Sequence, residues 1–329
     1  MPTALISPRE VAQFAARYED VFSAAGWSVK YPPPGEANIL TPAELREALA
    51  GVDAVVAGSE AYTGEVFDLF PRLKVVARVG VGYDSVDVPA ATARGVAVTV
   101  AAGTNHESVA EHTFALLLAY TRLVPLRNRL IHAGGWPRHY SRPLRGQTLG
   151  LAGLGRIGKA VAVRAMAFGM RVIAYDPLPV DMTGIERVTW DELLAQSDFL
   201  SLHLPLTPGT RHVVNAAAFA RLKPGAVLVN TSRGGLVNEE ALVAALRGGH
   251  LGGALLDVLE QEPPPAGHPL LGLENVLLTP HAAGVDTRSL GDMARSAAES
   301  IVAIGRGDWP AEKVVNPEVG RGRTAAQET

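Results

Sequence analysis

The chain has 329 residues, 47% of them hydrophobic and 19% charged, so it is long enough for two domains that each bury a core. Its 30 basic and 33 acidic residues give a net charge of -3 without any Lys/Arg block, which argues against binding to nucleic acid or to a membrane surface. It contains no cysteine, which excludes disulfides, thiol nucleophiles and cysteine-ligated zinc.

The amino terminus has none of the features of a secretion signal. MPTALISPREVAQ lacks a basic segment followed by an apolar one. The apolar run FALLLAY is too short to cross a bilayer. We therefore expect a soluble, cytoplasmic protein.

Short runs rich in Val, Leu and Ile alternate with helical patterns along the chain. Strands that are buried on both faces and separated by helices predict an α/β fold, with two Rossmann-like, doubly wound parallel-sheet domains. The predicted strands are TALIS (3–7), AVVAGS (54–59), KVVARVG (74–80), VAVTV (96–100), TLGLAGL (148–154), RVIAYD (171–176), DFLSLHL (198–204), AVLVNTS (226–232), GALLDV (253–258) and NVLLTP (275–280).

Two intervening helices have clear start signals. Thr41 with Glu44, and Thr189 with Glu192, have the spacing of capping boxes.

The longest helical pattern runs from Glu107 to about Arg122 and is apolar over most of its circumference, which predicts a helix buried on several sides. The basic and aromatic segment that follows, residues 127–147, is predicted to be irregular, and such a long connection is either functional or an interaction arm. The polar tail GRGRTAAQET is predicted to be disordered.

A glycine fingerprint lies between two predicted strands. Gly153, Gly155 and Gly158 have G-x-G-x-x-G spacing after one strand and before a helical pattern, and the next strand ends in Asp176. Gly153 permits a tight turn, Gly155 lets the backbone approach a pyrophosphate, and Gly158 allows close helix packing. The pattern predicts a Rossmann dinucleotide site.

Asp176 indicates which dinucleotide binds. Its carboxylate can accept both ribose hydroxyls of NAD but would repel the 2′-phosphate of NADP. Pro177 and Leu178 follow it, so no adjacent arginine could receive that phosphate. The sequence therefore favours NAD, although Asp176 could also be a solvated acid at a strand end.

Three ionisable residues follow later strands, at the end where open α/β sheets bind ligands: Arg233, Glu262 and His281. Arginine can anchor a carboxylate, histidine can exchange a proton near neutral pH, and a neighbouring carboxylate favours the imidazolium. These are the groups needed to oxidise a 2-hydroxy acid. The alternative for Arg233 is that it caps a surface turn.

The motifs around these residues resemble the three signatures of the D-isomer-specific 2-hydroxyacid dehydrogenase family. The signatures are TSRGGLVNEEAL, ALLDVLEQEPP and LLTPHAAG; with GLGRIGKAVAVRAMAFGM and ARVGVGYDSVD, the similarity runs from about residue 50 to 318. The resemblance implies that Arg233 holds the substrate, that His281 exchanges the hydroxyl proton while hydride passes to NAD, and that Glu262 stabilises protonated His281.

The resemblance also implies further contacts to NAD. Asp257 is one of them, although it could instead be an acid that caps a turn. Together with the fingerprint, the implied cofactor-binding set is Gly153, Gly155, Arg156, Ile157, Gly158, Asp176, Leu204, Thr231, Ser232, Asp257, Ala283 and Gly284.

A second Gly-x-Gly follows a predicted strand, at Gly80 and Gly82. Successive backbone N–H groups in such a turn can cradle an anion. The resemblance implies a substrate-carboxylate loop made of Gly80, Val81 and Gly82, and a plain tight turn is the alternative.

The stretch NHESVAEHT suggests a metal site, but the pattern does not support one. H-E-x-x-H is absent, and His106 and His112 are six residues apart, so they align poorly on one helix face. We predict no metal.

The resemblance implies a domain organisation. Residues 1–100 with 286–329 form the substrate domain, and residues 101–285 form the NAD domain, with the active site in the cleft between them. The helix from Glu107 and the arm to about residue 147 build a twofold dimer in this family, so we expect a homodimer.

The substrate is less clearly indicated. GVGYDSVD, SVAEHT and VVNPEV are most similar to the D-3-phosphoglycerate dehydrogenase branch, although that branch's frequent C-terminal regulatory domain is not present in this sequence. Ala57 and Gly58 replace an Arg-Ser pair found in many of those enzymes, which weakens the case for a phosphorylated substrate. Reduction of glyoxylate or hydroxypyruvate is the alternative.

Two other functions fit the sequence less well. Formate dehydrogenases share the fold but have glutamine where Glu262 stands. An NADH-sensing corepressor is a different class of protein, and the absence of turnover with any 2-hydroxy acid would favour it.

Overall fold

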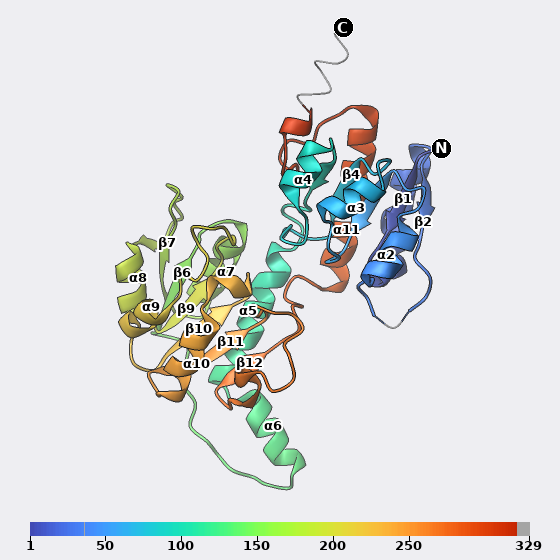
Figure 1. Cartoon of the computed structure of the whole chain (residues 1–329). Coiled ribbons are helices and arrows are strands. Elements are labelled where there is room, and N and C mark those ends of the chain that lie inside the picture. Colours follow the sequence, from blue (N-terminus) through green and yellow to red (C-terminus); the bar gives the residue numbers. More distant parts are fainter. Residues whose placement is uncertain (36, 321–329) are drawn as a thin grey trace. The chain divides into compact units, whose positions relative to one another are not determined.

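A computed structural model describes residues 1–35 and 37–320 (Figure 1). The chain divides into two compact units, one made of Met1–Asn105 and Val285–Thr329, the other of His106–Gly284. Each unit is built on one parallel sheet with helices on both faces, which confirms the predicted α/β class. The part of the predicted polar tail beyond Gly320 lies outside the described residues.

The first unit has a five-stranded sheet in the order β2-β1-β3-β4-β5. Alternate residues of a strand face opposite sides, so Ile6 packs with α11 and η1, while Leu5 packs with α2 and α3. The strands are β1 (Thr3–Ile6), β2 (Ser28–Lys30), β3 (Ala54–Ala57), β4 (Val75–Arg78) and β5 (Ala97–Thr99). The helices are η1 (Arg9–Arg17), α1 (Glu19–Ala24), α2 (Pro42–Ala48), α3 (Gly64–Leu69), α4 (Val88–Ala93) and α11 (Thr287–Arg306).

The second unit has a seven-stranded sheet in the order β12-β11-β10-β9-β6-β7-β8. Helices α8, α9 and α10 cover one face, and α5 and α7 cover the other. The strands are β6 (Thr148–Ala152), β7 (Arg171–Tyr175), β8 (Glu186–Arg187), β9 (Phe199–Leu202), β10 (Ala226–Asn230), β11 (Leu251–Leu256) and β12 (Val276–Leu278). The helices are α5 (His106–Thr121), α6 (Val124–His132), α7 (Arg156–Ala167), α8 (Trp190–Gln196), α9 (Ala216–Arg221), η2 (Gly234–Leu236), α10 (Glu239–Arg247) and η3 (Pro269–Gly272).

Every predicted strand is present, and both predicted capping boxes form, at Thr41 and at Thr189. The prediction of an irregular segment over 127–147 is wrong in its first part, because α6 continues to His132. Leu123, which is left-handed, separates α5 from α6, and Pro125 lies in the first turn of α6. Two short strands, β2 and β8, were not predicted because neither is a buried apolar run.

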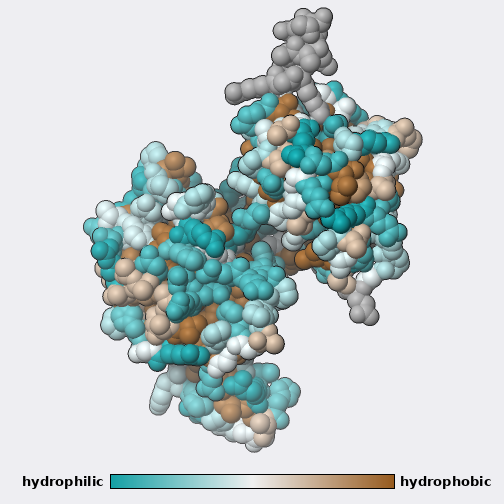
Figure 2. All heavy atoms as spheres, in the orientation of Figure 1, coloured by the Kyte–Doolittle hydropathy of each residue, from teal (hydrophilic) through white to brown (hydrophobic). Residues whose placement is uncertain are grey.

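No helix in the described part of the chain is long and apolar enough to cross a membrane. Figure 2 shows the visible face of each unit covered mainly by hydrophilic and neutral residues, with apolar patches scattered between them.

Candidate active site

The candidate site lies along one edge of the seven-stranded sheet. The strands run parallel, so their carboxyl ends meet at the same edge, which is where ligands bind in open α/β sheets. The glycine turn follows β6, Asp176 follows β7, Arg233 follows β10, and Asp257 follows β11. His281 comes shortly after the last strand, β12.

The three glycines of the fingerprint have different surroundings. Gly153 is left-handed (φ 101°), and a Cβ there would lie 2.6 Å from the His203 carbonyl oxygen. A Cβ on Gly158 would lie 2.2 Å from the Gly153 carbonyl oxygen. A Cβ on Gly155 would meet none of the described atoms within 4 Å. Two glycines are therefore required by the turn itself, whereas Gly155 borders open space.

The open space lies at the amino end of α7, the part of a helix that favours anionic groups such as a pyrophosphate. Gly155 is the N-cap, and no side chain of the described residues caps the helix. The N–H groups of the first turn and the positive end of the helix dipole thus face outward at an exposed glycine. Arg156 is exposed and Ile157 half-buried in this first turn.

We predict that Gly155→Ala separates cofactor binding from folding. The added methyl group occupies the space of the pyrophosphate, so the Kd for NADH should rise roughly tenfold or more, equivalent to about 1.4 kcal/mol of binding free energy. The midpoint of thermal unfolding should stay unchanged. Gly158→Ala is the contrasting variant and should lower that midpoint, because its Cβ meets backbone. Unchanged NADH fluorescence titration of Gly155→Ala would contradict the placement.

Asp176 is held in a fixed position at the end of β7. The Leu154 N–H donates to Asp176 Oδ2 at 2.7 Å and the Leu178 N–H donates to Oδ1 at 2.9 Å. An arginine does reach this loop, contrary to the expectation from the neighbouring sequence. Arg187 of β8 donates to the Leu178 carbonyl oxygen at 3.1 Å and lies 3.6 Å from Asp181. The acid at position 176 still disfavours a 2′-phosphate.

His203 packs beneath the glycine turn, which the sequence did not indicate. Burial lowers the pKa of its imidazole to about 4, so the ring is neutral at physiological pH. Its Nε2 lies 2.9 Å from Ser201 Oγ. His203 is therefore part of the support of the turn.

Arg233 lies on a segment that packs closely against the loop carrying Glu262. Asn230 Nδ2 donates to the Arg233 carbonyl oxygen at 2.8 Å, and Arg233 Nη1 donates to the Ser232 carbonyl oxygen at 2.6 Å. A Cβ on Gly234 would lie 2.0 Å from the carbonyl carbon and oxygen of Leu259. Only glycine allows the two segments to approach this closely.

Glu262 and His281, which are 19 residues apart in sequence, form a direct contact. Glu262 Oε2 lies 2.6 Å from His281 Nδ1, and Oε1 accepts a hydrogen bond from the Leu259 N–H at 2.9 Å. Burial raises the pKa of Glu262. Four stabilising interactions outweigh burial and lower this pKa below its usual value: the hydrogen bond and the charge of His281, the Leu259 N–H, and the charge of Arg233. The carboxylate therefore stays ionised beside the imidazole.

The backbone around His281 is held by Asp257. His281 is left-handed (φ 55°), and its N–H donates to the Asp257 carbonyl oxygen at 2.8 Å. The Ala282 and Ala283 N–H groups donate to the two carboxylate oxygens of Asp257 at 2.9 and 2.8 Å. Asp257 thus acts as the acid that caps this turn, and its side chain is buried.

The other residues implied to contact NAD lie along the same edge. Leu204 is buried after β9, and Thr231 is buried after β10 with its Oγ1 3.2 Å from Thr113 Oγ1. Ser232 donates from its N–H and Oγ to Asn230 Oδ1 at 3.1 and 3.2 Å. Gly284 is the last residue of the second unit.

The Gly80–Gly82 loop belongs to the first unit, at the carboxyl end of β4. Arg78 Nε donates to the Gly82 carbonyl oxygen at 3.0 Å, and the Gly80 carbonyl oxygen accepts from the Ala101 N–H at 2.8 Å. Val81 is exposed at the tip. The loop is thus anchored at both ends.

The two histidines of NHESVAEHT lie on α5 and have separate partners. His106 Nε2 is 3.5 Å from Glu107, whereas His112 Nε2 is 2.9 Å from Thr279 Oγ1. Within the described residues, no three His, Asp or Glu side chains gather where they could hold a metal ion.

Comparison with known proteins identifies the family. The family model "D-isomer specific 2-hydroxyacid dehydrogenase, NAD binding domain" matches residues 114–283. A glyoxylate reductase of Korarchaeum cryptofilum is 41% identical over 315 residues, which cover 92% of each chain. A D-3-phosphoglycerate dehydrogenase of Methanocaldococcus jannaschii is 42% identical over 285 residues, 84% of this chain but 54% of that relative.

A solved structure agrees with this identification. The crystal structure of the TT0316 protein of Thermus thermophilus superposes with a TM-score of 0.84 at 38% identity, covering 95% of this chain and 99% of that one. The chain belongs to the D-isomer-specific 2-hydroxyacid dehydrogenase family and is an NAD-dependent dehydrogenase of that family.

Proposed function

We propose that this enzyme reduces a small, unphosphorylated 2-oxo acid, with glyoxylate as the leading candidate and hydroxypyruvate next. The observation that carries the proposal is the 2.6 Å contact between Glu262 and His281, with the charge of Arg233 close enough to act on Glu262. This set supplies an anion anchor, a proton donor and a group that stabilises the donor in its charged form.

Each residue has one task in the reaction. NADH, when bound, would supply the hydride for C2 of the acid. Arg233 binds the carboxylate and the oxo oxygen through its planar fork. His281 gives a proton from Nε2 to that oxygen, so the oxo group becomes a hydroxyl. Glu262, bonded to Nδ1, stabilises the ring while it is protonated.

The choice of glyoxylate over 3-phosphoglycerate rests on two observations. The glyoxylate reductase relative matches over nearly its whole length, whereas the D-3-phosphoglycerate dehydrogenase relative is matched over about half. The comparisons therefore favour glyoxylate reduction, the alternative from the sequence, over 3-phosphoglycerate oxidation, which the sequence motifs favoured. At the carboxyl end of β3, Glu60 is buried and accepts a hydrogen bond from Ser7 Oγ at 2.8 Å. A carboxylate at this edge of the first sheet disfavours a phosphate.

A substrate panel tests the proposal. NADH consumption is measured with glyoxylate and hydroxypyruvate, and NADH formation with 3-phosphoglycerate, D-lactate and D-glycerate, with NADP cofactors in parallel. We expect the highest kcat/KM for glyoxylate or hydroxypyruvate with NADH. A preference for 3-phosphoglycerate would instead indicate a D-3-phosphoglycerate dehydrogenase. No turnover at all would favour an NADH-sensing binding protein.

We further propose that the first unit binds the substrate carboxylate through Gly80, Val81 and Gly82, and that the second unit binds NAD. The supporting observation is that the loop presents backbone at the carboxyl end of β4, with Arg78 bonded to the Gly82 carbonyl oxygen. Gly82→Pro, which removes one N–H donor, is expected to raise KM for the 2-oxo acid but not the Kd for NADH.

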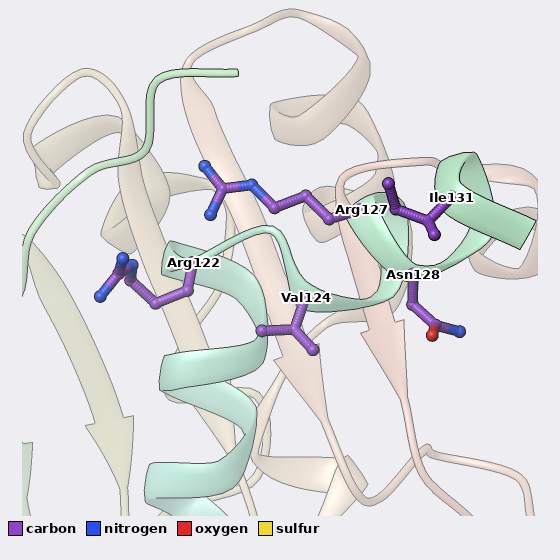
Figure 3. Close-up of a pocket in the computed structure, with 5 residues that line it drawn as sticks. All are labelled: Arg122, Val124, Arg127, Asn128 and Ile131. Carbon is purple, nitrogen blue, oxygen red and sulfur yellow. The ribbon is translucent and has the colours of Figure 1, made fainter. Parts of the chain in front are cut away.

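The proposed assembly is a homodimer through α6 and the following arm. No residue of α6 is buried, and four large apolar side chains of this region are exposed: Val124, Ile131, Trp136 and Tyr140. Figure 3 shows Val124 and Ile131 lining an open hollow together with Arg127. Exposed apolar side chains that gather in one region are typical of an interface. A monomer at micromolar concentration by light scattering would refute the dimer.

A further inference from the structure

Helix α5 has a polar row that faces the carboxyl ends of the strands. Ser108 and His112 are four residues apart, hence on one face of the helix, and Thr113 is adjacent. Ser108 Oγ donates to the Ala283 carbonyl oxygen at 2.9 Å, and His112 Nε2 lies 2.9 Å from Thr279 Oγ1. Through Ser108 and His112, helix α5 thus contacts the segment that carries His281.

The hydrogen bonds in this row have a defined direction. Thr279 Oγ1 has one proton and donates it to Asp257 Oδ1 at 2.6 Å. It must therefore accept from His112, which fixes the proton of that imidazole on Nε2. This series of hydrogen bonds runs from His112 through Thr279 to Asp257. The Asp257 carboxylate also accepts the Ala282 and Ala283 N–H groups.

The series of hydrogen bonds ends at the backbone around His281. The Asp257 carbonyl oxygen accepts the N–H of His281 itself, and the Asp257 carboxylate accepts the N–H groups of the two residues that follow. His281 needs such restraint because a left-handed conformation costs free energy for a residue other than glycine. A buried carboxylate also needs its hydrogen bonds filled, and Thr279 fills one of them.

We infer that His112 and Thr279 are positioning residues for His281, acting through Asp257; this inference rests on the proposed reductase function. Side-chain hydrogen bonds of the two residues run to each other and to Asp257. Their effect is to hold the imidazole beside Glu262, so that its Nε2 keeps the orientation that proton transfer to the substrate requires.

The test compares two substitutions of the same residue. Thr279→Val keeps the shape but removes the hydroxyl, whereas Thr279→Ser retains it. Thr279→Val is expected to lower kcat about 10- to 100-fold, with little change in the Kd for NADH. Thr279→Ser is expected to retain most of the kcat of the unmodified enzyme. His112→Leu should resemble Thr279→Val, while His112→Gln, which keeps an N–H donor, should retain more activity.

Thr121→Val is the matched control. Thr121 is buried on the same helix, and among the described residues its hydroxyl bonds to the Leu117 carbonyl oxygen within that helix. It should leave kcat unchanged. If Thr279→Val keeps full kcat, or if it changes only the Kd for NADH, the inference is overturned.

A second readout does not depend on turnover. The ¹⁵N signals of the His281 ring, assigned with His281→Ala, report its contact with Glu262 in the full chain. They should move in Thr279→Val and not in Thr121→Val. Unmoved signals would overturn the positioning role, whereas lack of turnover by the unmodified enzyme would contradict only the proposed reaction.

Discussion

Replacing His281 by alanine is expected to lower kcat for the reduction of 2-oxo acids by about 100- to 10,000-fold, the range that a lost general acid costs. The His281 ring contacts the Glu262 carboxylate, and its side chain is half exposed, so a substrate oxygen can reach it. NADH binding should change little. Steady-state kinetics together with NADH fluorescence titration measure both effects.

The matched control for this variant is His250→Gln. His250 lies at the amino end of β11, whereas the candidate residues lie at the carboxyl end. Its Nε2 is 3.1 Å from the Leu222 carbonyl oxygen, a bond that a glutamine amide can replace. His250→Gln should therefore keep full turnover. Near-normal kcat in His281→Ala would rule out His281 as the proton donor.

Much of this edge of the sheet follows from local sequence patterns. Continuous apolar runs indicated the buried strands, the glycine spacing indicated the turn at Gly153, and the polar residues after β10 and β12 indicated where Arg233 and His281 stand. Each of these signals lies within a short stretch, because strand burial, turn geometry and strand ends are properties of neighbouring residues.

The supporting contacts have no such local signal. His112 attracted attention only as a possible metal ligand, although its partner is Thr279, 167 residues away. Ser108 and Ala283 are 175 residues apart. Which residue of a helix faces which strand end depends on tertiary packing, which no spacing within the helix encodes. Arg187 was missed for a different reason: it lies on β8, a two-residue strand without an apolar run.

Gly234 is the second position where we expect a large effect. It is the first residue of η2, directly after Arg233, and a Cβ there would lie 2.0 Å from the carbonyl carbon of Leu259 and 2.4 Å from the Glu260 nitrogen. These are backbone atoms, which cannot turn aside as the end of a side chain can. The same loop presents Glu262, whose Oε1 accepts from the Leu259 N–H.

Gly234→Ala should therefore displace Arg233 and Glu262 from each other. We expect kcat/KM to fall about 100-fold or more, and the free energy of unfolding to fall by about 1–3 kcal/mol, as overpacking of a filled interior does. Gly272→Ala is the control, since a Cβ there meets none of the described atoms within 4 Å. Kinetics and urea unfolding of both variants distinguish the cases. Normal kcat/KM in Gly234→Ala would mean that the two segments can separate without loss, and that reaction geometry does not depend on their close approach.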